Sequence, residues 1–350
     1  TEYELAWERP GAVSTNYTVR HIPYPAGELQ PQGYYLLLTT AVTQSGATPA
    51  AAPRSAVPRP GSGGGAEAAA GTAGDTSQLG AEGGESLYLR SMTDDLMGWN
   101  DPRAKLSRAL EENQFLLFAQ KILALKSGLA DPSCMEILLR LQEEEDNFLP
   151  PGGFLPLAER YGMMEDLDRW VVRNVISWCL KRMRKDPDSR LPLCCVNLSE
   201  ASVKSLEFAP YVMNELQIAG LPARTLCFEI GEQDAINHHA YAQRLIAALK
   251  PAGCLHTIDA FGSTKVTFSY LKGLPIDFLK IDGNIIQYIL RDSAELAKAK
   301  AINTVCQKVG VRSIAEFVES KETLGKLREI GMDYVQGFGI ARPEPISKLS

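Results

Sequence analysis

Two spacings of apolar residues alternate along residues 101–350. Short runs that are apolar, β-branched or cysteine-rich predict strands at 194–196, 226–228, 255–258, 278–281, 312–315 and 334–335. Between them, apolar residues recur at helical spacing and predict helices at 166–184, 241–249, 294–309 and 321–330. Repeated strand–helix units predict a parallel sheet. Some eight units in about 250 residues favour a closed (β/α)8 TIM barrel, an α/β fold, over an open doubly wound sheet.

The chain before this region has a different pattern. Residues 46–85 hold 10 Gly, 11 Ala and 4 Pro, so we interpret 46–100 as a flexible linker and lead-in. Residues 1–45 contain an alternating stretch at 17–22, a Pro/Gly turn at 25–27 and an apolar run at 34–38, which predicts a strand–turn–strand unit. A lone hairpin is not stable. We therefore expect a β-rich remnant of an upstream sensory domain, which weakly resembles the end of a PAS domain.

Composition limits the classes of function. Lys plus Arg is 36 against 42 for Asp plus Glu, a net charge of −6, which argues against binding of a nucleic-acid polymer. No apolar run reaches the roughly 18 residues of a membrane span, so no membrane segment is expected in this sequence. Seven scattered cysteines without a C-x-x-C motif predict buried free thiols in a reducing cytoplasm. His238 and His239 are adjacent, without the i, i+4 spacing of a helical metal site, and predict a helix start instead.

A polar residue follows the apolar core of each strand unit. These residues are Glu136, Asn197, Glu229, Asp259, Lys280, Glu316 and Gln336. One acidic residue after a strand is usually a helix N-cap, but in a barrel seven such residues would meet at one mouth, where active sites lie. Carboxylates and an amide this close would repel one another unless cations neutralise them, and oxygen donors suit Mg²⁺ or Mn²⁺. With Lys280 to orient or deprotonate water, or to stabilise developing charge, the pattern indicates phosphoester chemistry.

The same residues belong to ordered motifs that resemble the EAL domain, the bacterial cyclic-di-GMP (c-di-GMP) phosphodiesterase family, over about residues 104–346. The motifs are Glu136–Arg140, Asn197–Ser199, Glu229–Glu232, Leu274–Asp282, Ala315–Glu319 and Gln336–Phe338. The resemblance implies a modified TIM barrel that binds c-di-GMP and hydrolyses it to the linear dinucleotide. It also implies a homodimer.

The resemblance also assigns roles residue by residue. It implies metal ligands at Glu136, Asn197, Glu229, Asp259 and Glu316. It implies catalytic roles, acting on or positioning water, for Lys280, Glu316 and Gln336, and contacts with the ligand for Gln120, Arg140 and Asp282. Glu232 would anchor the loop that closes over the site.

One departure from the family pattern bears directly on activity. The second Asp of the family's Asp-Asp-Phe-Gly motif, which helps to hold a second metal, is Ala260 here, and the following loop is altered at Thr264 and Lys265. A methyl group cannot coordinate a cation, so we expect one metal site and a doubtful second one. The favoured hypothesis is a c-di-GMP receptor with absent or severely reduced hydrolysis. The alternatives are an active Mg²⁺/Mn²⁺-dependent phosphodiesterase, in which water or Asp282 compensates, and a protein-interaction domain without ligand.

Overall fold

The computed structural model describes residues 99–349 except 129–132, 143–147, 187–189 and 264–265, together with three strands near the N-terminus. The chain divides into two units, Thr1–Gly74 and Asp75–Ser350. In the first, β2 (Thr15–His21) pairs antiparallel with both β1 (Glu2–Trp7) and β3 (Leu36–Thr40). The β2–β3 pair matches the predicted strand–turn–strand unit, whereas the turn at 25–27 and the linker lie outside the described residues. A PAS origin stays a prediction.

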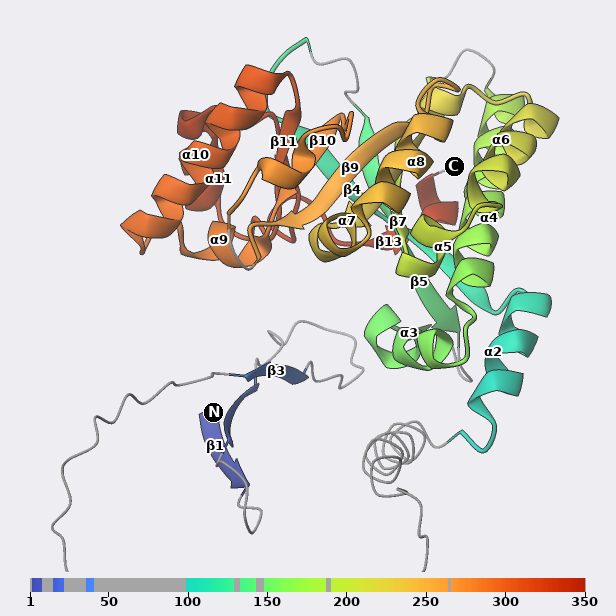
Figure 1. Ribbon diagram of the computed structural model, residues 1–350, viewed down its shortest axis with the longest axis horizontal. Helices are drawn as coiled ribbons and strands as arrows, with labels where there is room; N and C mark the ends of the chain where they lie inside the picture. The colour runs from blue at the N-terminus through green and yellow to red at the C-terminus, as the bar shows by residue number, and fades with distance from the viewer. Residues whose placement is uncertain are drawn as a thin grey trace, which may run out of the picture. The chain divides into compact units, whose positions relative to one another are not determined.

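The second unit is built on a closed barrel of eight strands (Figure 1). The strands, in their order around the barrel, are β4 (Phe115–Ala124), β5 (Cys134–Gln142), β7 (Leu193–Leu198), β8 (Leu226–Gly231), β9 (Leu255–Phe261), β10 (Phe278–Ile281), β11 (Arg312–Ala315) and β12 (Tyr334–Val335). The pairing of β4 with β5 closes the ring. The predicted modified TIM barrel is confirmed.

One strand departs from the predicted parallel sheet. β4 runs antiparallel to both of its neighbours, β5 and β12, while the other barrel pairs are parallel. The connection from β4 to β5 spans only residues 125–133. A parallel pair would need a crossover of about a dozen residues or more, so the short connection forces an antiparallel pair. Two short strands, β6 (Phe148–Leu149) and β13 (Glu344–Pro345), extend the sheet.

Helices surround the barrel strands (Figure 1). Four match the predicted helices: α4 (Met164–Lys185), α8 (His239–Leu249), α10 (Ser293–Val309) and α11 (Lys321–Ile330). The others are α2 (Pro102–Glu111), α3 (Pro151–Arg160), α5 (Glu200–Lys204), α6 (Phe208–Ala219), α7 (Glu232–Asn237), α9 (Gly283–Tyr288) and the 3-10 turns Ala223–Thr225, Ser269–Leu271 and Ile346–Leu349. Within the described part of the chain, none of the helices is long and apolar enough to cross a membrane.

Capping residues fix the ends of two of the predicted helices. Asp292 accepts a hydrogen bond from the backbone N–H of Ala294 (2.7 Å) and caps α10. Ser320 accepts one from Thr323 (3.0 Å) and caps α11. Such side chains satisfy backbone donors that the first helical turn leaves unpaired. The helix boundaries are therefore encoded locally.

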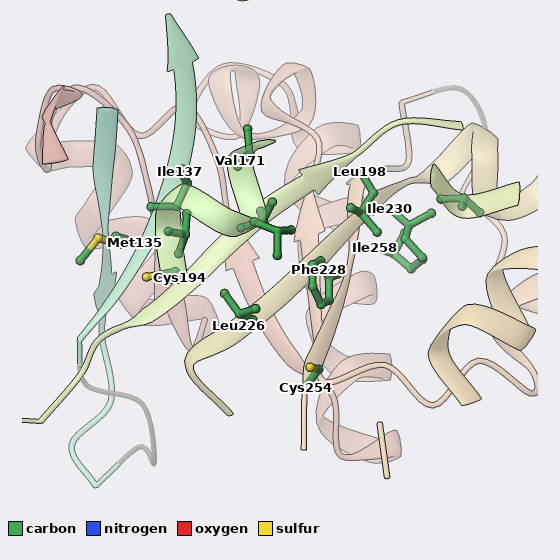
Figure 2. Packing of buried hydrophobic residues seen from close by; sticks show 14 of the residues in the cluster. Met135, Ile137, Val171, Cys194, Leu198, Leu226, Phe228, Ile230, Cys254 and Ile258 are labelled. Atoms are coloured by element: carbon green, nitrogen blue, oxygen red, sulfur yellow. The ribbon is translucent and has the colours of Figure 1, made fainter. Parts of the chain in front are cut away.

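The strands separate two apolar clusters because successive side chains point to opposite faces. One face packs against the helices and includes Phe228, Ile230 and Ile258 (Figure 2). The other forms the floor of the barrel interior and takes a residue from every barrel strand: Ile122, Cys134, Leu193, Cys195, Cys227, Leu255, Phe278, Ile314 and Tyr334. We call this second cluster the apolar layer. All seven cysteines are buried and free, as predicted.

Candidate functional site

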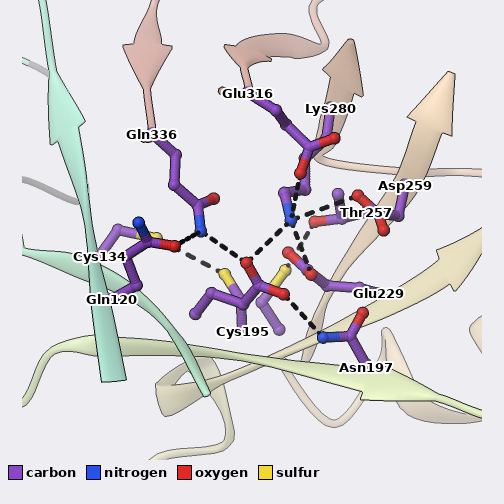
Figure 3. A network of polar contacts seen from close by, with 12 residues as sticks. Gln120, Cys134, Cys195, Asn197, Glu229, Thr257, Asp259, Lys280, Glu316 and Gln336 are labelled. Atoms are coloured by element: carbon purple, nitrogen blue, oxygen red, sulfur yellow. Dashed lines mark hydrogen bonds and ion pairs between the residues drawn. The ribbon is translucent and has the colours of Figure 1, made fainter. Parts of the chain in front are cut away.

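A polar layer adjoins the apolar layer, and Figure 3 shows its residues together with Cys134 and Cys195 of the apolar layer. It takes one residue from each barrel strand or from the position just after it: Gln120, Glu136, Asn197, Glu229, Asp259, Lys280, Glu316 and Gln336. Along its strand, each polar-layer residue except Asp259 lies two residues from an apolar-layer residue, as Glu136 does from Cys134 and Lys280 from Phe278. Residues two or four apart on a strand point to the same face, so Asp259, four residues from Leu255, also faces the interior. On the antiparallel β4 the order reverses, so that Gln120 precedes Ile122. The structure therefore brings the predicted strand residues together.

The strands run further past Asn197, Glu229 and Asp259 than predicted, whereas Lys280 lies inside its strand, as the predicted strand at 278–281 implies. Only Glu316 and Gln336 directly follow their strands. Glu136, Asn197, Glu229, Asp259 and Lys280 lie inside β5, β7, β8, β9 and β10. The reason is that apolar residues facing the helices, such as Ile137 and Ile230, keep the strands paired beyond the polar positions.

Lys280 is the centre of the polar layer. Its Nζ lies 3.3 Å from Glu136 Oε2, 3.1 Å from Glu229 Oε2, 3.2 Å from Asp259 Oδ1 and 3.1 Å from Glu316 Oε1. The Lys280 side chain is only 1% exposed, so water contributes little to its solvation. One ammonium group therefore faces four carboxylates, which leaves a net charge of −3 when all of them are ionised.

Amide groups complete the hydrogen bonding of Glu136. Gln336 Nε2 donates to Glu136 Oε2 (2.6 Å) and to Gln120 Oε1 (3.0 Å), and Asn197 Nδ2 donates to Glu136 Oε1 (2.8 Å). Gln120 in turn donates to the carbonyl of Ala341 (2.9 Å). Glu136 therefore has donors on both oxygens, which is the environment that an ionised buried carboxylate needs.

The four carboxylates do not share this environment equally. Burial opposes ionisation of Glu136, but Lys280, Asn197 and Gln336 outweigh it and lower the Glu136 pKa. Burial dominates at Glu229 and raises its pKa well above the ordinary range despite Lys280. Burial also raises the pKa of Glu316 to about 8. Burial alone would lower the pKa of Lys280, but the surrounding carboxylates raise it well above its usual value.

The donor set fits a divalent cation. Among the described residues, the buried oxygens Glu229 Oε1 and Asp259 Oδ1 have no hydrogen-bond partner, although Asp259 Oδ1 makes the ion pair with Lys280. A buried acceptor oxygen without a donor is costly, because it loses its hydrogen bonds to water without replacement. Mg²⁺ and Mn²⁺ prefer such oxygen ligands and would offset the net negative charge.

The ordered motifs that carry these residues match a known family. A sequence profile of the EAL domain matches residues 103–343. The chain belongs to the EAL domain family.

Individual relatives agree with this assignment. The chain is 33% identical over 243 residues to cyclic di-GMP phosphodiesterase PdeB of Shewanella oneidensis, covering 69% of this chain and 28% of the relative. It is 32% identical over 262 residues to phosphodiesterase PdeF of Escherichia coli, covering 75% and 34%. The chain thus spans about a third or less of the length of these two curated relatives.

Solved EAL structures share the fold. The FimX EAL domain from Pseudomonas aeruginosa bound to c-di-GMP superposes with a TM-score of 0.65 at 32% identity, covering 70% of this chain and 97% of that one. The PaMucR phosphodiesterase in complex with c-di-GMP gives a TM-score of 0.64 at 29% identity, covering 71% and 99%. The chain is therefore related both to c-di-GMP phosphodiesterases and to EAL domains solved with c-di-GMP.

Ala260 occupies an unusual backbone position in this EAL domain. Leu279 of β10 pairs with Ile258, whereas Ile281 pairs with Phe261, so β9 carries one extra residue as a β-bulge. Ala260 lies in this bulge with φ of +53°, in the left-handed region. Asp and Asn adopt that region several-fold more readily than most residues. The backbone thus has a shape that suits the family's Asp, while the side chain is a methyl group.

Glu232 holds the segment that follows the bulge. Its Oε2 accepts a hydrogen bond from the backbone N–H of Gly262 (3.0 Å) and lies 3.4 Å from Ser263 Oγ, and its Oε1 accepts from the Tyr270 hydroxyl (3.1 Å). Glu232 therefore has the contacts expected of a loop anchor, and Tyr270 is a partner that the sequence reading missed. Thr264 and Lys265 lie outside the described residues.

Arg140 and Asp282, the two other residues predicted to contact the ligand, have different surroundings in the structure. Arg140 lies on the same face of β5 as Glu136, four residues along, with its guanidinium over the Phe118 ring at 5.5 Å. Asp282 accepts a hydrogen bond from the backbone N–H of Asn284 (2.8 Å) and caps α9. Asp282 therefore has the capping role that is common for an acidic residue after a strand, and its role in ligand binding stays a prediction.

Proposed function

We propose that this chain is a c-di-GMP receptor domain built on a phosphodiesterase barrel, and that hydrolysis is absent or severely reduced. The observation that carries the proposal is Ala260, a methyl group in the β9 bulge beside an otherwise retained set of oxygen donors. The relatives named as phosphodiesterases and the solved complexes with c-di-GMP support the choice of ligand.

Electrostatics set a condition on ligand binding. A dinucleotide with two phosphodiester groups is an anion, and the polar layer is itself net negative. Glu136, Asn197, Glu229, Asp259 and Glu316 would hold one Mg²⁺ or Mn²⁺, which would neutralise charge and polarise a phosphate oxygen. Arg140 would donate to phosphate with its planar guanidinium. Binding of c-di-GMP should therefore depend on a divalent ion.

The protonation state of Lys280 limits its chemical role. Four carboxylates hold its ammonium group, and its pKa lies well above the usual value, so it remains protonated at neutral pH. A protonated lysine cannot accept a proton from water. We therefore assign Lys280 to stabilising negative charge and positioning the carboxylates, with Gln336 as a neutral hydrogen-bonding group beside Glu136.

Hydrolysis would need a second metal ligand that the residues of this site do not provide. In the family pattern the second Asp contributes a charged oxygen to a second metal. Each catalytic metal supplies several kcal/mol of charge stabilisation as well as an activated water. Ala260 supplies neither ligand nor charge, and this is the reason to expect a receptor in place of an enzyme.

An active phosphodiesterase is the second candidate. The observation that favours it is the retention of all the other polar-layer residues, together with a left-handed backbone at residue 260. In that case a water molecule, or Asp282 after release from its cap on α9, would take the place of the missing carboxylate.

Calorimetric titration with c-di-GMP tests the receptor proposal. We expect micromolar or tighter binding in Mg²⁺ or Mn²⁺ that is lost on chelation. Arg140→Met should weaken binding about tenfold to a hundredfold, since it removes charge-assisted hydrogen bonds. Arg312→Met is the matched control, because Arg312 also lies over an aromatic ring (Phe278, 4.0 Å) but at the start of β11, away from the polar layer.

The outcomes separate the candidates. Binding without formation of the linear dinucleotide supports the receptor. Steady turnover in the same samples, followed by chromatography, would show a working phosphodiesterase. No binding at micromolar concentrations in either metal would overturn both and leave a protein-interaction domain. A homodimer, an upstream sensory partner and a cytoplasmic location stay predictions.

A further inference from the structure

A group of side chains of types that can bind metal lies on the segments that follow β7 and β8. Among the residues that the structure describes, Glu200, Asp234 and His238 form a set of His, Cys, Asp or Glu side chains whose ligand atoms all lie within 4.8 Å of one another. Glu200 begins α5, shortly after β7, and Asp234 lies in α7, shortly after β8. His238 follows α7 and is the N-cap residue of α8.

Sequence spacing supports the pairing of two of these residues. Asp234 and His238 are four residues apart across α7 and its C-cap, so their side chains lie on one face of the turn. An i, i+4 pair on a helix is the spacing used by helical metal sites. The sequence reading considered His238 only with His239, and so missed Asp234 as its partner. His239 instead lies with its Nε2 2.7 Å from the carbonyl of Tyr270.

The distances suit one small ion. Zinc binds nitrogen and oxygen ligands at about 2.1 Å, which places neighbouring tetrahedral ligands about 3.4 Å apart. His238 Nε2 lies 3.0 Å from Glu200 Oε1, and the whole set spans no more than 4.8 Å. The side chains of Glu200 and His238 are 43% and 24% exposed, so an ion can enter from solvent and water can complete its coordination.

Carboxylates around the group favour binding of a cation, whereas one lysine opposes it. Burial and the nearby carboxylates of Glu200 and Glu159 raise the pKa of Asp234, against the effect of His238. Lys204 Nζ lies 3.0 Å from Glu200 Oε1, the same oxygen that faces His238, and competes with a metal for it. The alternative to a metal site is therefore a simple surface network of His238, Glu200 and Lys204.

We propose that Glu200, Asp234 and His238 form a zinc-binding site that uses none of the polar-layer residues. One imidazole nitrogen and two carboxylates suit zinc, whereas Mg²⁺ and Ca²⁺ prefer oxygen ligands alone. A zinc ion here would join α5 to α7. Because α7 begins at Glu232, zinc would stabilise the helix that holds Gly262 and Tyr270 beside the mouth.

The test is a titration of the full chain with ZnCl₂ in excess Mg²⁺, which occupies sites made only of oxygen donors. Bound zinc is measured by equilibrium dialysis. The imidazole resonances are followed by NMR, where only four histidines contribute. We expect one zinc ion to bind at micromolar concentrations and to shift the His238 resonances. His238→Gln should abolish this binding, while His239→Gln, the matched control, should retain it.

A second variant separates a metal site from a simple ion-pair network. Lys204→Met removes the competing ammonium group and should tighten zinc binding by up to about fivefold, the scale of an exposed ion pair. In a network without a metal function, this change would produce no zinc affinity. The proposal is overturned if no zinc binds at micromolar concentrations, or if bound zinc is the same in wild type and His238→Gln.

Discussion

The two layers of the barrel interior are built from the same strands and face the same space, yet their chemistry is opposite. Cys134, Phe278 and Tyr334 fill the apolar layer, and Glu136, Lys280 and Gln336 stand two residues further along the same strands. In the lower layer packing supplies the stability. In the upper layer one buried ammonium holds four carboxylates in place. A single barrel therefore combines an apolar floor with a charged mouth.

Among the changes that test this comparison, removal of the Lys280 ammonium group should lower the free energy of unfolding the most. Lys280→Met leaves Glu136, Glu229, Asp259 and Glu316 without their shared counter-ion. Loss of one partner of a buried ion pair costs about 3–5 kcal/mol. We expect a fall of this size in the free energy of unfolding in a chelator, measured by urea denaturation, with partial recovery in Mg²⁺ or Mn²⁺.

Lys250→Met provides the control for this change. Lys250 pairs with Asp277 at 2.9 Å, but its side chain is 33% exposed. A partly exposed pair of this kind is worth about 1 kcal/mol or less. Equal losses for the two lysine variants would contradict the special role of Lys280.

A polar atom placed in the apolar layer should have a smaller effect. Cys195 Sγ lies 3.6 Å from Cys134 Sγ in this layer. Cys195→Ser introduces a hydroxyl where sulfur and apolar side chains surround it, at a cost of about 1–3 kcal/mol. Cys195→Ala removes the thiol without adding a polar atom, and thermal denaturation of the two variants should rank serine as the less stable.

A titration should reveal the polar layer through an effect that is spread over several pH units. Burial raises the pKa of Glu316 to about 8 in the folded protein, above the ordinary value of about 4.3 in the unfolded chain. The folded state then binds more protons, so its stability in a chelator is highest below the unfolded pKa and falls as the pH rises through 8. One group contributes a slope of at most about 1.4 kcal/mol per pH unit.

Glu316→Gln should flatten this decline between pH 6 and 8, as measured by denaturation at each pH. Glu319→Gln is the matched control, because Glu319 is an exposed carboxylate three residues along the same segment. A wild-type profile that stays flat in the chelator would show that Glu316 does not carry the raised pKa.

Local patterns explain why much of the fold was predictable. Short apolar runs and helical spacing identified β7 to β12 and four helices, because most of their buried residues are apolar. The direction of β4 was not predictable from its pattern, since an apolar run looks the same in either direction. Only the short connection to β5 determines it.

The candidate site was predictable in its members but not in its contacts. Their positions after the apolar cores of the strand units predicted that Lys280 and the carboxylates meet at one barrel mouth. No spacing rule indicates that one lysine contacts all four carboxylates. The role of Asp282 was ambiguous, because an acidic residue after a strand is equally suited to capping a helix. Tyr270 lies 38 residues from Glu232, and such long-range pairs leave no local signal.

Ala260→Asp tests the central claim most directly. The variant restores a carboxylate at a position whose φ of +53° an Asp accepts readily. Formation of the linear dinucleotide from c-di-GMP in Mn²⁺ or Mg²⁺ is followed by chromatography for wild type, Ala260→Asp and the uncharged control Ala260→Asn. The account predicts intact c-di-GMP with wild type, clear turnover with Asp and much less with Asn. Wild-type turnover equal to that of Ala260→Asp would contradict it.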